Sequence, residues 1–99
     1  MILTREQIQK VVTEYFAEKP VKKVWLFGSY ARGDADEESD VDVLIDVDYS
    51  VNVGWDYFIW HEELQKQLNT KVDVVTLAGL SKFIKPLVDK DKSLIYEKA

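Results

Sequence analysis

The first apolar segment of the chain has helical spacing. Its apolar residues recur three and four positions apart and form one stripe, as in a helix that packs against a core: Ile8, Val11, Val12, Tyr15 and Phe16. Thr4 and Gln7 match a capping box, so the helix is predicted to begin after Thr4. Pro20 disfavours a helical conformation in the residue before it, which predicts the helix end. Residues 21–27 form a β-rich run without polar alternation after Lys23, and they predict a strand covered on both faces.

Residues 40–48 alternate in a way that predicts a strand with two different faces. One face is β-branched and consists of Val41, Val43, Ile45 and Val47. The other face carries Leu44 and four aspartates: Asp40, Asp42, Asp46 and Asp48. Asp40 and Asp42 therefore project from the same side, roughly 6 to 7 Å apart along the backbone. Asp46 lies about 13 Å beyond Asp42. Asp46 and Asp48 are therefore predicted to be strand-end or turn residues outside any site built around Asp42.

A second helix is predicted over residues 55–68, after a loop at 49–54. Its core stripe has helical spacing and consists of Tyr57, Trp60, Leu64 and Leu68. Three large apolar residues fall outside the stripe: Trp55, Phe58 and Ile59. They are interpreted either as anchors of a protein interface or as core residues covered by the terminal segment 80–96. His61 is the single histidine and is expected on the helix surface.

The remaining apolar runs complete the predicted order of helices and strands. They predict a strand at 72–76, a short helical segment at 80–87 that Pro86 kinks or restarts, and a terminal strand at 93–96. This order is typical of a small α/β (α+β) domain with a mixed β-sheet flanked by helices. Ninety-nine residues predict a single domain over 1–99.

Asp73 interrupts the otherwise apolar strand at 72–76. A carboxylate in a buried strand costs several kcal/mol unless it is paired or bound to a metal ion. Asp73 is therefore interpreted as a metal ligand close to Asp40 and Asp42. The alternative is a salt bridge to a neighbouring lysine or arginine.

Gly28 and Ser29 follow the strand at 21–27 and precede a polar loop. If a short helix begins there, its free backbone N–H groups face a site where an anion can bind, and Gly28 allows the backbone to approach that anion closely. The carboxylate pair of Asp40 and Asp42 suits Mg²⁺, which prefers a few carboxylates together with phosphates of a substrate. The sequence therefore predicts a phosphate site beside a metal site.

These residues resemble a known motif. Gly28-Ser29, Ala31-Arg32-Gly33 and Ser39-Asp40-Val41-Asp42, with ten residues between Ser29 and Asp40, are similar to the GS…DxD motif of the DNA polymerase beta-like nucleotidyltransferase superfamily. The short chain points to the branch of minimal nucleotidyltransferases (MNT). Members of that branch have a third aspartate on a later strand, which Asp73 matches. A lone DxD is a weak signal, whereas GS, ARG and SDxD in this order and spacing are specific.

The resemblance implies nucleotidyl transfer, in which a hydroxyl group attacks the α-phosphate of a nucleoside triphosphate and pyrophosphate leaves. ATP is the expected nucleotide and AMP the expected group. Asp40 and Asp42 would hold two Mg²⁺ ions and the triphosphate. Asp73 would bind the metal that activates the attacking hydroxyl and take its proton.

The resemblance also implies roles at the glycine turn. Gly28 and Ser29 would cradle the β- and γ-phosphates. Arg32 has two interpretations, a contact with phosphate or a salt bridge that holds the acidic loop at 34–39. The acidic residues of this loop are expected to be solvated and not to be metal ligands.

The same resemblance implies a partner, since minimal nucleotidyltransferases of HEPN/MNT toxin-antitoxin pairs accompany a HEPN-type toxin. The chain is therefore expected to be the antitoxin and to modify a hydroxyl side chain of that toxin. Two alternatives stay open: a non-catalytic antitoxin that only binds its toxin, and a regulator that senses ATP and metal without transfer. The presence of GS and three aspartates favours the enzyme, because a binding module needs no third carboxylate.

Charge and composition limit the classes of partner that the chain is expected to bind. Eighteen acidic and 13 basic residues give a net charge of −5, which argues against a broad nucleic-acid surface. The chain has no cysteine, no signal-peptide pattern at its start and no apolar run of the ~18 residues that a membrane span requires. A cytoplasmic protein without membrane contact is expected.

Overall fold

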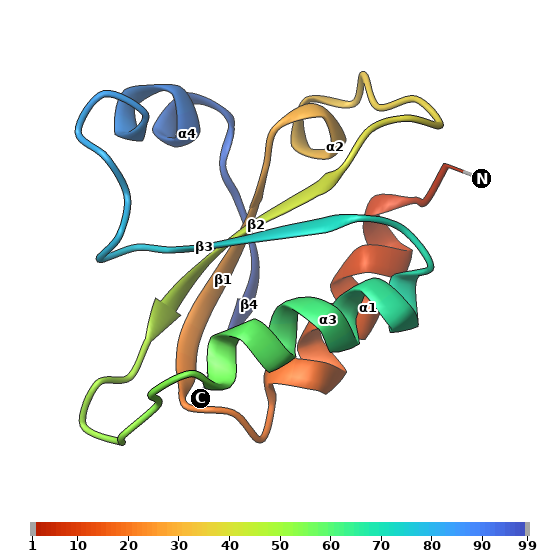
Figure 1. Ribbon diagram of the computed structural model, residues 1–99. Coiled ribbons are helices and arrows are strands. Elements are labelled where there is room, and N and C mark those ends of the chain that lie inside the picture. Colours follow the sequence, from red (N-terminus) through yellow and green to blue (C-terminus); the bar gives the residue numbers. More distant parts are fainter. Residues whose placement is uncertain (1, 99) are drawn as a thin grey trace.

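Four strands form one mixed sheet at the centre of the structure, a computed structural model that describes residues 2–98 (Figure 1). The strands are β1 (Val21–Phe27), β2 (Val41–Val47), β3 (Val72–Thr76) and β4 (Ser93–Glu97), in the spatial order β3-β2-β1-β4. β1 is antiparallel to β2 and β4, whereas β2 and β3 are parallel. The parallel pair needs a crossover connection, which the helix between these strands provides. The predicted fold class is confirmed.

Two long helices, α1 (Arg5–Phe16) and α3 (Asp56–Leu68), lie together against one face of the sheet (Figure 1). The predicted capping box is present: the Gln7 N–H donates to Thr4 Oγ1 at 3.1 Å, and the Thr4 N–H donates to Gln7 Oε1 at 2.8 Å. Within the described chain, no helix is long and apolar enough to cross a membrane.

Aromatic contacts join the two long helices. Phe16 is fully buried and packs edge to face on Tyr15 and on Trp60, with ring centroids 5.1 and 5.9 Å apart. The Tyr15 hydroxyl donates to Glu63 Oε1 at 2.8 Å. Burial of Tyr15, together with this hydrogen bond, raises the pKa of its hydroxyl above its ordinary value. The α1–α3 contact therefore combines apolar packing with one polar link.

The opposite face of the sheet has thinner cover. It carries α2 (Ser29–Arg32) and α4 (Lys85–Asp91), which contact the sheet mainly through β1 and β2 (Figure 1). In β1, Val24 and Leu26 are fully buried on the α1–α3 side, but Trp25 and Phe27 remain partly exposed. The prediction that this strand is covered on both faces is therefore wrong, because two short helices do not screen the second face.

The C-terminal helix begins and ends later than the predicted segment at 80–87. Its regular part begins at Lys85, with Pro86 in the first turn, where the missing N–H costs no hydrogen bond. Residues 80–84 form turns instead, and Phe83 and Leu87 are exposed. α4 lies away from α3 (Figure 1), so the segment 80–96 does not cover Trp55, Phe58 and Ile59. All three side chains are exposed, Trp55 to 78%.

Replacement of Phe16 by alanine should destabilise the fold strongly. Phe16 is fully buried and contacts an aromatic residue of α1 and one of α3, so its truncation leaves a cavity in the core. The free energy of unfolding should fall by about 3 to 5 kcal/mol. Urea denaturation measures this loss. Glu14→Ala, at an exposed position of the same helix, is the control and should change the free energy of unfolding by less than about 0.5 kcal/mol. Equal effects of the two changes would contradict the assigned core.

Candidate functional site

Gly28 forms the turn between β1 and α2. Its φ of +75° lies in the region that favours glycine. A Cβ on this residue would collide with the Asp42 carboxylate and stand only 3.3 Å from Asp42 Cγ. Glycine is therefore required twice, by the backbone conformation and by the close approach of the Asp42 side chain.

The short helix α2 begins directly after this turn. The Gly28 carbonyl accepts from the N–H groups of Ala31 and Arg32, at 3.1 and 3.0 Å. The helix ends at Gly33, whose left-handed conformation allows its N–H to donate to the Ser29 carbonyl. The first N–H groups of any helix lack acceptors within the helix. In this chain α2 starts directly after Gly28, the residue that the Asp42 carboxylate approaches.

The sheet register brings the candidate carboxylates together. Asp42 pairs with Phe27 of β1 on one side and with Asp73 of β3 on the other. Asp40 lies two residues before Asp42, directly ahead of β2. Burial raises the pKa of Asp42 from 3.8 to about 6, and the negative charges of Asp73 and Asp40 add to this shift. The three aspartates therefore lie within electrostatic reach of one another.

Asp73 differs from the sequence-based expectation in its burial. Its side chain is exposed, because β3 is an edge strand and this residue faces away from the α1–α3 core. The argument that desolvation forces Asp73 to bind a metal or a cation is therefore wrong. Asp42 is the half-buried carboxylate, and no lysine or arginine lies within ion-pair distance of it in the described chain. Asp40 instead has Lys71 Nζ at 3.8 Å.

The donor set fits a hard divalent cation in its chemistry, since Mg²⁺ prefers carboxylate oxygens. Burial, and then repulsion by Asp73 and Asp40, raise the pKa of Asp42, and a bound cation would favour its charged form. Across residues 2–98, no three histidine, cysteine, aspartate or glutamate side chains stand close enough to surround a metal ion as they are placed. Bringing three oxygens onto one ion therefore requires side-chain rotation, which is open to the exposed Asp73.

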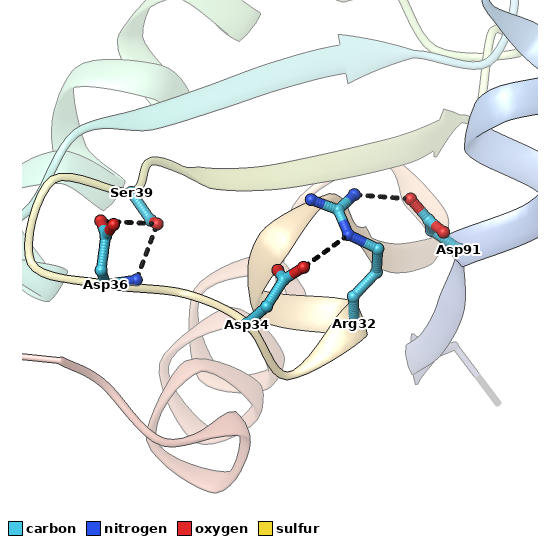
Figure 2. Close-up of polar contacts among 5 residues, drawn as sticks. All are labelled: Arg32, Asp34, Asp36, Ser39 and Asp91. Atoms are coloured by element: carbon cyan, nitrogen blue, oxygen red, sulfur yellow. Dashed lines mark hydrogen bonds and ion pairs between the residues drawn. The ribbon is translucent and has the colours of Figure 1, made fainter.

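Arg32 projects from the end of α2 towards α4 and is held by two carboxylates (Figure 2). Its Nε donates to Asp34 Oδ2 at 3.2 Å and its Nη1 donates to Asp91 Oδ2 at 2.8 Å. The hydrogen bond that Arg32 donates to Asp91, and then that to Asp34, raises the pKa of Arg32 above its ordinary value. The expected salt bridge to the acidic loop is present. Arg32 also favours the charged form of Asp42, so it lies within electrostatic reach of the carboxylates.

Asp91 is the residue of this group that sequence reasoning missed. It stands 59 positions from Arg32, and no local pattern distinguishes it from other acidic residues near the C-terminus. Its side chain is only 18% exposed. The contact between Asp91 and Arg32 ties α4 to the end of α2, beside the carboxylates.

Three other aspartates make structural contacts. The Asp36 N–H donates to Ser39 Oγ at 2.9 Å, and the Glu38 N–H donates to Asp36 Oδ1 at 2.9 Å, so the loop before β2 closes on itself (Figure 2). Asp46 lies 4.0 Å from Lys22 Nζ. Asp48 accepts from the Ser50 N–H and hydroxyl, which agrees with its predicted place in a turn.

The sequence profile of the nucleotidyltransferase domain matches residues 5–98, a span that includes Gly28 and all three aspartates. The chain belongs to the nucleotidyltransferase domain family. The resemblance predicted from the GS and DxD motifs is confirmed, and the chain is a nucleotidyltransferase.

Relatives and solved structures agree with this assignment. Protein adenylyltransferase MntA of Thermococcus cleftensis is 34% identical over 83 residues, which are 80% of this chain and 83% of that protein. A crystal structure of a toxin-antitoxin pair with AMP-PNP gives a TM-score of 0.74 at 18% identity over 93% of this chain and 73% of that one. The structure of a tri-AMPylated Shewanella oneidensis HEPN toxin in complex with an MNT antitoxin gives a TM-score of 0.71 at 16% identity. The match covers 97% of this chain and 74% of that one. At these identities the two structures show a shared fold.

The raised pKa of Asp42 predicts that Asp42→Asn increases the Tm by an amount that depends on pH. Between about pH 4 and about pH 6, Asp42 keeps its proton in the folded protein but has released it in the unfolded chain. The folded state therefore loses stability relative to the unfolded chain as the pH rises through this range. Asp42→Asn should therefore have a higher Tm than the native protein at about pH 8, and the gain should shrink near pH 4. Thermal unfolding at both pH values measures this.

Asp48→Asn is the matched control, because hydrogen bonds from Ser50 lower the pKa of Asp48. This change should lower the Tm at about pH 8, with a smaller loss at acidic pH. A gain from Asp42→Asn that is equal at both pH values would contradict the burial and repulsion assigned to Asp42.

Alanine substitutions at Gly28 and Gly33, the residues that flank α2, distinguish backbone strain from steric crowding. Gly28 and Gly33 both have positive φ, but a Cβ at Gly33 would meet no atom within 4 Å. Gly33→Ala should cost about 1 to 2 kcal/mol from strain alone. Gly28→Ala should cost more and should also weaken ATP binding, since its methyl group displaces the Asp42 carboxylate. Urea denaturation and calorimetric titration with ATP measure the two effects, and equal ATP affinity in both variants would contradict a phosphate site at this turn.

Proposed function

We propose that this chain uses Mg²⁺ to transfer AMP from ATP to a hydroxyl side chain of a partner protein, a HEPN-type toxin, and so acts as an antitoxin. The observation that carries the proposal is the contact of the Gly28 turn with Asp42, which is flanked by Asp40 and Asp73. This contact supports a triphosphate that reaches the turn and the carboxylates together. We further propose that residues 1–99 act as one domain.

In the proposed mechanism the three aspartates have different tasks. Asp40 and Asp42 would hold the metal ions, and the raised pKa of Asp42 supports a site whose charged form a bound cation would favour. Bound Mg²⁺ would supply charge stabilisation to the attacking and leaving oxygens. Asp73 lies on the exposed edge strand, where an acceptor hydroxyl can approach it and pass its proton to it.

The turn at the start of α2 positions the nucleotide in this proposal. Gly28 and Ser29 present backbone N–H groups to the β- and γ-phosphates. The acceptor oxygen forms a bond to the α-phosphorus, the bond from this phosphorus to the bridging oxygen breaks, and pyrophosphate leaves. Arg32 positions α4 through Asp91, or reaches the phosphates after leaving Asp91.

The partner is proposed from the relatives and from one surface feature. One relative is named a protein adenylyltransferase, and an MNT antitoxin of the same fold is seen with a tri-AMPylated HEPN toxin. In this chain Trp55, directly before α3, and Phe58 and Ile59 in its first turn are exposed, and the rings of Trp55 and Phe58 stack with centroids 5.5 Å apart. Exposed aromatic residues of this kind support a protein interface.

The test is incubation of the protein with Mg²⁺, a HEPN-type partner and ATP labelled on the α-phosphate. Label should appear on the partner, and ATP labelled on the γ-phosphate should transfer none. Asp73→Asn should reduce transfer by about 100-fold or more, since a positioned acid or base contributes at least this much, and should leave ATP affinity close to native. Native transfer rates in Asp73→Asn would refute its role.

A binding-only antitoxin gives a different result in the same assay. In that case the partner is bound and inhibited while no label is transferred, and Asp73→Asn inhibits as well as the native protein. A nucleotide sensor binds ATP and neither inhibits nor labels the partner.

Added Mg²⁺ should raise the Tm of the native protein and not that of Asp42→Asn if the carboxylates hold the ion.

A further inference from the structure

An apolar hollow lies away from the Gly28 turn. It has a volume of about 520 Å³ and lies between the loop after β2, the start of α3 and the second half of β3. Its lining is mainly apolar and consists of Val47, Tyr49, Val51, Asn52, Val53, Gly54, Tyr57, Val74, Val75 and Thr76. No lysine or arginine is among these lining residues, so a triphosphate or a nucleic-acid backbone finds no cation here.

A second, smaller hollow connects this pocket to Asp73. It has a volume of about 190 Å³ and is lined by Tyr57, Phe58, His61, Asp73 and Val74. Tyr57 and Val74 line both hollows, so the two adjoin along β3. We call the joined hollows the edge groove. The edge groove begins at the aspartate proposed for the acceptor hydroxyl and continues into an apolar pocket.

Along the edge groove the outer backbone of β3 is open at Val74, whereas the Thr76 carbonyl accepts from the Gly79 N–H at 3.2 Å. The Val41 N–H donates to the Lys71 carbonyl and the Leu77 N–H donates to the Ile45 carbonyl, at 2.9 and 2.8 Å. In a parallel pair the residues that bond to the neighbouring strand alternate, so the peptide groups of Val74 and Thr76 face away from β2. The Val72 N–H also faces outward and donates to Gln65 Oε1 at 3.1 Å. The outward donor of Val74 stands where both hollows meet.

We infer that the edge groove binds an extended segment of the acceptor protein, which pairs with the free edge of β3 and places its hydroxyl side chain at Asp73. This inference rests on the proposed function. An unpaired strand edge binds an extended chain through backbone hydrogen bonds, and adjacent pockets select alternate side chains. Asp73 and Val74 are consecutive, so the hydroxyl residue and an apolar residue of the segment are neighbours.

The chemistry of the edge groove defines the segment further. The apolar pocket takes an aliphatic or aromatic side chain. Consecutive strand residues face opposite sides of a sheet, so the neighbour of the hydroxyl residue enters the apolar pocket, where an acidic side chain is disfavoured. The segment is therefore extended, carries an apolar residue beside its hydroxyl residue, and lacks adjacent acidic residues.

Short synthetic peptides with a central hydroxyl residue and either apolar or acidic neighbours are the probe. AMP transfer from ATP should favour the apolar set, and Val51→Glu should raise the KM for these peptides by about tenfold or more with little change in ATP affinity. Leu94→Glu is the matched control: Leu94 is 43% exposed on β4, the opposite edge strand, whereas Val51 is 51% exposed in the edge groove. Tyr49→Glu, also in the groove, is the second variant if Val51→Glu fails to fold.

Hydrogen exchange followed by NMR provides a readout that does not depend on catalysis. Peptide binding without nucleotide should slow exchange of the Val74 amide more than that of the amides of β4. Slowed exchange without AMP transfer would refute the proposed function and leave the edge groove as a peptide site. Transfer that Val51→Glu and Tyr49→Glu leave unchanged would refute the groove and leave the function. Slowed exchange caused by self-association, detected as a dimer that Val51→Glu dissociates, would assign the edge to a second copy and overturn the inference.

Discussion

The close approach of Gly28 and Asp42 is the constraint on which the candidate site depends. β1 and β2 are antiparallel, and their register sets Asp42 opposite Phe27, the last residue of β1. The chain must then turn sharply away from the sheet, and Gly28 is the residue whose missing side chain leaves room for the Asp42 carboxylate. One strand register therefore decides where α2 begins and which carboxylate is buried beside it.

Burial of Asp42 has an energetic consequence. Removal from water and repulsion by Asp73 and Asp40 both favour the protonated form, so the apo site opposes the charge that its proposed chemistry requires. Arg32 acts in the opposite direction, but its hydrogen bonds go to Asp34 and Asp91. The fold thus carries a local instability that a divalent cation would relieve, in a chain whose net charge is already −5.

The two faces of the sheet differ in cover: one packs against the core helices and the other carries the candidate site. α1 and α3 cover one face, and their buried residues, which include Phe16, Trp60 and Leu64, pack with strand residues to form the core. The opposite face carries Asp42 and keeps only the two short helices α2 and α4. Because the core needs just one face, the other face has thin cover, and β3 stays at the edge where Asp73 and the edge groove meet solvent.

Local sequence alone determined the capping box at Thr4, the alternation of β2, and the GS and DxD motifs, because each depends on residues a few positions apart. These signals were enough for the fold class and for the family. The tertiary structure decided the exposure of Asp73 and Trp25 and the contact of Arg32 with Asp91, which lies 59 residues away. Burial depends on which strand lies at an edge and which helix covers which face, and long-range ion pairs leave no periodic pattern. Such properties arise only when distant segments pack together.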